Sequence, residues 1–137
     1  MTKRAIGRLV REWQVALRLS DWRIEVEVLP ALVVAEDGRW AEIDCQRCSM
    51  LATLKVAGRR SAEDIERSVI HELIHGLLDD AVSYHAMLAE AGLDRRGREV
   101  AVSEMMMLCE QATWRLEDCI FRLAQEARNV RTTLGSH

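Results

Sequence analysis

Residues 61–78 read SAEDIERSVIHELIHGLL, and this segment carries the strongest structural pattern in the chain. Ser61 followed by acidic residues is typical of a helix start, because a serine side chain accepts an unpaired backbone N–H and acids suit the positive helix end. Apolar residues then recur at helical spacing, at Ile65, Val69, Ile70, Leu73, Ile74, Leu77 and Leu78. The segment therefore predicts a central, buried helix.

The residues before this helix predict one further helix and a small sheet. Apolar residues at helical spacing indicate a helix over residues 3–19 that lies against the sheet. Residues 22–29 read WRIEVEVL, and their strict alternation predicts a half-buried strand with Trp22, Ile24, Val26 and Val28 inward. Further strands are expected at 40–44 and 52–56, with a weaker candidate through Val33 and Val34. We expect this sheet to be mostly antiparallel.

The residues after residue 78 are predicted to be helical, with an interruption. A short helix is expected around residues 81–91, and Gly92 and Gly97 after it favour a break in the helical structure. Residues 98–128 contain no glycine or proline and predict one long helix, followed by a frayed tail at 132–137. The expected fold is therefore α+β, as a single domain over residues 1–131.

Composition limits the classes of function. The chain has 137 residues, 49% of them apolar, and a net charge of −3 without a basic stripe, which favours one globular domain and argues against a nucleic-acid partner. The chain has neither an apolar run of transmembrane length nor a signal-peptide pattern, so we expect a cytoplasmic protein without a membrane partner. Its four cysteines should then be reduced, and the Cys45-x-x-Cys48 pair is interpreted as turn and core residues.

The pattern His71-Glu72-x-x-His75 lies in the middle of the predicted central helix. A spacing of four residues puts both imidazoles on one helix face, within reach of one cation, and neutral imidazole suits zinc. Glu72 is rotated by about 100° around the helix axis, where it can accept a proton from a zinc-bound water without coordinating the metal. The pattern therefore predicts a zinc site with Glu72 as the general base.

A catalytic zinc site needs a third protein ligand and one open position. The extended pattern with a third histidine fails, because Leu78 and Ala81 stand where glycine and histidine are required. Glu110 and Glu104 on the late helix are the candidates on partly apolar faces, and the remaining candidates are Asp79, Asp80 and His85. The residues alone leave this choice open.

The chain resembles the small zincin-like metallopeptidases of phages and mobile elements, and the gluzincin core in general. The resemblance rests on a first helix running into LSDWRIEV (19–26), on ATLKV (52–56), on VIHELIHGLL (69–78), and on a late-helix pattern E-[EQ]-x-x-x-R-L, matched by EQATWRL (110–116). It implies that Glu110 is the third ligand and that the protein is a zinc-dependent enzyme hydrolysing peptide bonds. It also implies that a peptide or protein substrate pairs with the edge of strand 52–56.

The sequence leaves open which further residues assist catalysis and whether the protein is an enzyme at all. Tyr84 and His85 are the nearest groups that could stabilise an oxyanion, so we expect them to assist catalysis. The alternative function is a catalytically silent, zinc-stabilised binding or assembly module of a phage or mobile element. Glu72 favours the enzyme, because a purely structural metal site does not need it. A peptidase that cleaves a single regulatory partner would use the same residues.

Overall fold

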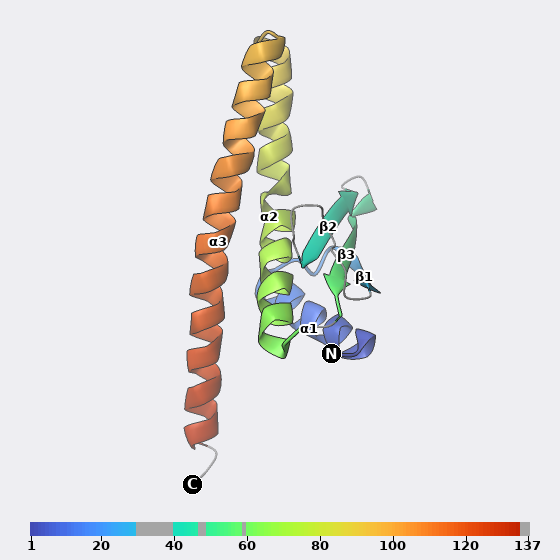
Figure 1. Cartoon of the computed structure of the whole chain (residues 1–137), viewed down its shortest axis with the longest axis vertical. Coiled ribbons are helices and arrows are strands. Elements are labelled where there is room, and N and C mark those ends of the chain that lie inside the picture. The colour runs from blue at the N-terminus through green and yellow to red at the C-terminus, as the bar shows by residue number, and fades with distance from the viewer. Residues whose placement is uncertain (30–39, 47–48, 59, 135–137) are drawn as a thin grey trace.

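The computed structural model describes residues 1–29, 40–46, 49–58 and 60–134. The elements, in chain order, are α1 (Lys3–Ala16), β1 (Arg23–Leu29), β2 (Ala41–Gln46), β3 (Leu51–Ala57), α2 (Ala62–Gly92) and α3 (Arg95–Leu134). Figure 1 shows α2 and α3 side by side as a long antiparallel hairpin, with α1 and the sheet against one half of α2. The predicted α+β class is confirmed.

The three strands form a mixed sheet in the order β1-β3-β2. β3 pairs in parallel with β1 and antiparallel with β2, so the expectation of a mostly antiparallel sheet is wrong. The physical reason is that β3 is the strand with the most completely buried face, and it takes the central position. β1 alternates apolar residues with charged ones, which suits an edge. The weaker strand candidate at Val33 and Val34 lies outside the described residues.

The core lies where α1, α2 and the inner face of the sheet meet. Ser61 starts α2 as predicted, since its hydroxyl accepts a hydrogen bond from the Asp64 N–H at 3.0 Å. The apolar face of α2 is buried, and the apolar residues of β1 are partly buried against the same core, as the alternation predicted. The largest contributors to this core are Ile6, Val10, Leu54, Val56, Ile65, Val69, Ile70, Leu73 and Ile74. This packing holds one face of α2 and leaves the opposite face to α3.

Both long helices extend further than predicted. Residues 81–91 continue α2 instead of forming a separate helix, because no glycine or proline interrupts them and α3 packs alongside. Gly92 ends α2, and Asp94 starts α3 by accepting the Gly97 N–H at 2.8 Å. α3 runs through residues 132–134 of the expected tail, and residues 135–137 lie outside the described part. Within the described residues, no helix has both the length and the apolar character needed to cross a membrane.

Candidate metal centre

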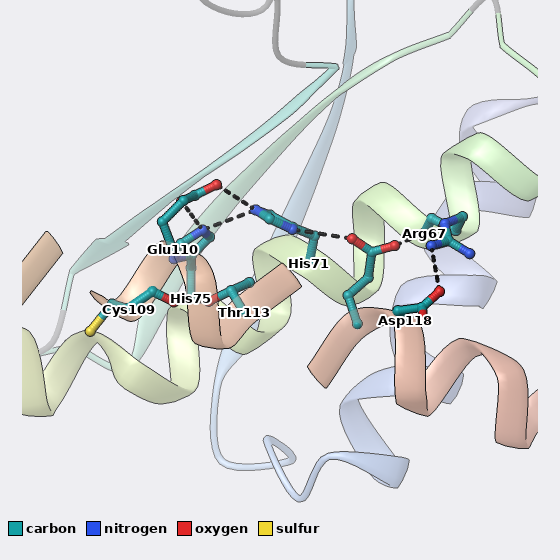
Figure 2. Close-up of polar contacts among 8 residues, drawn as sticks. Arg67, His71, His75, Cys109, Glu110, Thr113 and Asp118 are labelled. Atoms are coloured by element: carbon teal, nitrogen blue, oxygen red, sulfur yellow. Dashed lines mark hydrogen bonds and ion pairs between the residues drawn. The ribbon is translucent and has the colours of Figure 1, made fainter. Parts of the chain in front are cut away.

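The side chains of His71 and His75 converge on one point between α2 and α3. Their Nε2 atoms lie 3.1 Å apart, as the four-residue spacing predicted. The carboxylate of Glu110, on α3, lies over both rings: one oxygen is 3.4 Å from His71 Nε2 and the other is 3.0 Å from His75 Nε2 (Figure 2). One donor atom from each of the three residues can be chosen so that all three atoms lie within 4.8 Å of one another. These three side chains can therefore hold a metal ion.

The other candidates for the third ligand do not join this group. Glu104 is exposed on α3, and Asp79 lines a neighbouring cleft without joining the three donors. His85 Nε2 lies 3.3 Å from the carbonyl oxygen of Ala101, where it links the two helices. The side chain of Asp80 lies outside the described residues. Of the described candidates, the structure therefore brings only Glu110 to the two imidazoles.

The outer nitrogen of His71 has a carboxylate partner that the sequence reasoning missed. Glu117, also on α3, places Oε2 3.3 Å from His71 Nδ1. Its other oxygen forms an ion pair with Arg67 Nε at 2.9 Å, and Arg67 Nη2 in turn contacts Asp118 at 3.2 Å. A carboxylate beside Nδ1 favours the tautomer that carries its proton on Nδ1, which leaves the Nε2 lone pair facing His75 and Glu110.

Glu117 is one of the most buried side chains in the chain, with 1% of its surface exposed. Burial raises the pKa of Glu117, and the positive charge of Arg67 opposes that rise. Glu110, Thr113, Glu117 and Phe121 follow one another at helical spacing and share the α3 face that meets α2. The sequence signal for Glu117 is this spacing, which places it on the same face of α3 as Glu110.

Glu72 is buried beside His71 but is not one of the three converging donors. Only 6% of its surface is exposed, and its Oε2 accepts a hydrogen bond from the backbone N–H of Ile43 at 3.0 Å. This bond ties α2 to strand β2. Glu72 lines both clefts beside the three-residue group without belonging to it, and its role as a base stays a prediction.

Two clefts meet at this centre, and both are lined by Glu72 and Glu110. The tryptophan-side cleft, of about 350 Å³, is lined by His71 and, further out, by Trp40, Arg60, Arg67 and Trp114. The methionine-side cleft, of about 550 Å³, is lined by His75 and, further out, by Glu42, Ile43, Asp79, Met106 and Met107. The indole of Trp114 packs edge-on against His71, with ring centroids 4.6 Å apart. The centre is therefore reached from both sides.

The strand beside these clefts is β2, not the predicted strand at residues 52–56. That strand belongs to β3, which is paired on both sides, so its backbone has no edge to offer. β2 is the edge strand on the side of the centre, and its residues Ala41 and Ile43 line the tryptophan-side and methionine-side clefts respectively. The expectation failed because the order of strands in the sheet differs from their order along the chain.

Tyr84 and His85 do not reach the centre. They lie on the continuation of α2, with Tyr84 about 13 Å beyond His75 by helix rise. Tyr84 is mostly exposed, His85 bonds toward α3, and neither residue lines a described cleft at the centre. Tyr84 and His85 could turn back toward the centre only if the helix were broken near residue 80, and α2 continues through that residue without a break.

The cysteines contribute no described metal group of their own. Cys45 lies in β2 and lines the methionine-side cleft, while its partner in the CxxC pair, Cys48, lies outside the described residues. Cys109 contacts the sulfur of Met105 at 3.7 Å on the same helix.

Comparison of the chain with protein-family models, curated proteins and solved structures finds no match. The interpretation of the centre therefore depends on its own geometry and chemistry.

Proposed function

We propose that the protein is a zinc-dependent metallopeptidase in which Glu72 is the general base. The observation that carries this proposal is the convergence of His71, His75 and Glu110 beside a buried glutamate that is not part of the metal-binding group. Two nitrogen donors and one carboxylate, with a further acid alongside, are the residues that metal-assisted hydrolysis requires.

The spacing of the donor atoms fits zinc. Ligands about 2.0–2.1 Å from a tetrahedral zinc ion lie roughly 3.3 Å from one another. The two imidazole Nε2 atoms lie 3.1 Å apart, and each of the two Glu110 oxygens lies near one of them, at 3.0 Å from His75 and at 3.4 Å from His71. When bound, zinc polarises a carbonyl group and makes a water molecule acidic near neutral pH. Glu117 supports the site by fixing the His71 ring from its outer side.

Glu72 is placed to move the proton of the reaction. Peptide hydrolysis adds the oxygen of water to the carbonyl carbon and breaks the C–N bond, and one proton passes from the water to the departing amine. Glu72 accepts that proton and then donates it to the amine nitrogen. Its burial keeps bulk water from competing for this transfer. Its hydrogen bond to Ile43 holds the carboxylate beside the strand that borders the clefts.

We infer that an extended peptide substrate lies along the side of β2 that faces away from β3. The Trp40 carbonyl accepts the Ala57 N–H at 2.8 Å, so the backbone groups of Trp40 face β3. Because direction alternates along an antiparallel pair, the backbone groups of Ala41, Ile43 and Cys45 face away from β3. The Ile43–Glu72 hydrogen bond agrees with this alternation. A peptide that lies along this side passes both clefts and the metal group, while the Ile43 N–H stays bonded to Glu72.

The test compares wild type with Glu72→Gln after both are loaded with zinc. We expect one zinc ion per chain in both proteins, and hydrolysis of an unfolded protein substrate in the wild type only. Glu90→Gln, which changes an exposed glutamate on the same helix, is the matched control and should hydrolyse at the wild-type rate. Equal hydrolysis by wild type and Glu72→Gln would exclude the proposed role of Glu72.

A non-enzymatic binding module is the second candidate, and one observation favours it. The distal half of the α2–α3 hairpin exposes several large apolar side chains, namely Tyr84, Met87, Leu88, Leu93 and Val100. Exposed apolar side chains of this kind can serve as a protein-binding surface. Zinc binding without hydrolysis in the wild type, under the conditions of the test above, would support the module over the peptidase.

A further inference from the structure

The end of the α2–α3 hairpin that extends beyond the sheet has almost no core of its own (Figure 1). We call this part, residues 77–108, the distal hairpin. Among its residues whose burial is described, Ala89 alone is buried, with 5% of its surface exposed. A helix must bury its apolar stripe against another element to be held in place. The distal hairpin therefore presents apolar surface that no described residue of the same chain covers.

The exposed apolar residues of α2 in the distal hairpin fall on one face at coiled-coil spacing. They follow one another in alternating steps of four and three residues, as Leu77, Ala81, Tyr84, Leu88 and Ala91. We call this set the α2 seam, and its three large side chains are 43%, 60% and 51% exposed. The same steps lead back to Ile74 and Ile70, which are buried in the core. The seam is therefore the core face of α2, continued beyond the part that α1 and the sheet cover.

The position of α1 and the sheet restricts how a second hairpin can cover this seam. They lie on the seam face of α2, below Leu77, so two copies that face each other in the same direction would collide there. In the opposite direction, the distal hairpin of each copy lies over the seam of the other. A two-fold axis between Tyr84 and Leu88 then brings each Tyr84 to the second copy's Leu88, and each Ala81 to the second copy's Ala91. Every pair along the seam is apolar in this register.

The face that contains the seam is large enough for a specific dimer. Residues 77–91 span about 21 Å of helix, and two helices side by side are about 20 Å wide. The footprint is therefore about 400 Å² on each copy, or about 800 Å² for the pair. Interdigitated side chains lose more accessible surface than the flat footprint, which brings the total to about the 1,000 Å² that a specific interface needs.

We propose that the distal hairpin is a dimerisation surface, through which two copies of this chain associate as an antiparallel four-helix bundle. Facing hairpins of this kind are a standard way to bury helix seams that a single hairpin leaves exposed. The residues of the seam line neither cleft of the metal centre. The inference therefore goes beyond the proposed peptidase activity and does not depend on it.

The test measures the mass of the full chain by sedimentation equilibrium, up to about 200 µM, because an interface of this size is at the lower end of the specific range. We expect the mass of two chains for the wild type at the upper concentrations. Leu88→Glu and Tyr84→Glu should each raise the dissociation constant at least about tenfold, since dimerisation would bury an unpaired charge. Leu123→Glu is the matched control, because Leu123 is as exposed as Tyr84 but lies outside the distal hairpin, and it should associate as the wild type does.

Folding of the variants is checked by their helical circular dichroism, which should not change, since the replaced side chains are exposed in the single chain. The antiparallel direction has its own test. Ala81→Glu and Ala91→Lys should each weaken association, and the double variant should associate at least about fivefold more tightly than either single one. The introduced charges of opposite sign face each other across the interface only in the antiparallel register.

A wild type that stays a single chain at every concentration would overturn the inference and leave the seam to a different protein partner. A dimer that persists in both Leu88→Glu and Tyr84→Glu, or that Leu123→Glu disrupts equally, would place the interface elsewhere and overturn it as well. A double variant that associates no better than Ala81→Glu or Ala91→Lys alone would overturn the antiparallel arrangement.

Discussion

Replacing Glu117 with glutamine should weaken zinc binding without weakening the metal-free fold. The substitution keeps the shape of the side chain and removes the charge that faces His71 Nδ1 at 3.3 Å. Outer partners of metal-bound histidines typically contribute about 10–100-fold in affinity. A contact of 3.3 Å is at the long end for an N–H···O hydrogen bond, so we expect about tenfold, or about 1.4 kcal/mol.

The stability of the metal-free protein should change in the opposite direction or stay the same. Burial raises the pKa of Glu117, which means that the fold disfavours its charged form. A neutral amide removes that cost, and Arg67 retains its contact with Asp118 at 3.2 Å. A substitution that merely damaged the packing would lower both zinc affinity and stability.

The assay is competition for zinc against a chromophoric chelator, combined with urea unfolding of the metal-free protein. Asp118→Asn is the control, because it changes the neighbouring carboxylate, which contacts Arg67 and Arg122 but not His71. It should bind zinc as the wild type does. A zinc affinity of Glu117→Gln within twofold of wild type would refute the reasoning that Glu117 orients His71.

The remaining predictions concern stability. Burial raises the pKa of Glu66, but hydrogen bonds from Arg128 and Trp13 outweigh it and leave that pKa below its usual value. Glu66 therefore stabilises the fold above its unfolded-state pKa and loses this contribution as pH falls through its folded-state pKa; Glu66→Gln should cost about 1–3 kcal/mol in urea unfolding at neutral pH and much less in acid. Gly76→Ala should raise the free energy of unfolding by about 0.5–1 kcal/mol, since the added Cβ meets its nearest neighbour at an ordinary 3.6 Å within a helix. Gly58→Ala should instead lower it by about 1–3 kcal/mol, because its Cβ would lie 2.8 Å from a methyl group of the stiff Val28 side chain; equal thermal shifts in the two glycine variants would contradict both.

Much of the candidate centre was predictable because its main determinants are local. The turn of a helix fixes the relation between His71 and His75, and the apolar face of the same helix fixes which side is buried. The start of that helix at Ser61 and the alternation of β1 are likewise properties of a few consecutive residues. These features were predicted correctly for that reason.

The choice of Glu110 had a different origin. Reasoning from the residues left Glu104 open, since both lie on the same helix with apolar neighbours. Only the register between α2 and α3 decides which carboxylate meets the imidazoles, and that register is set by the length of the hairpin and its turn at Gly92 and Asp94. The contact of Glu117 with His71 depends on the same register, so the helical spacing from Glu110 indicates the face of α3 on which Glu117 lies but not the residue that it meets.

By itself, the sequence determined the helices, the alternation of β1 and β2, and the pairing of two imidazoles with a neighbouring glutamate, because each depends on backbone periodicity. The tertiary structure alone decided that β3 lies between β1 and β2, that β2 is the edge beside the centre, and that α2 continues past Tyr84. These features depend on which surfaces bury each other across the chain, and periodicity carries no information about the partner that a face will find.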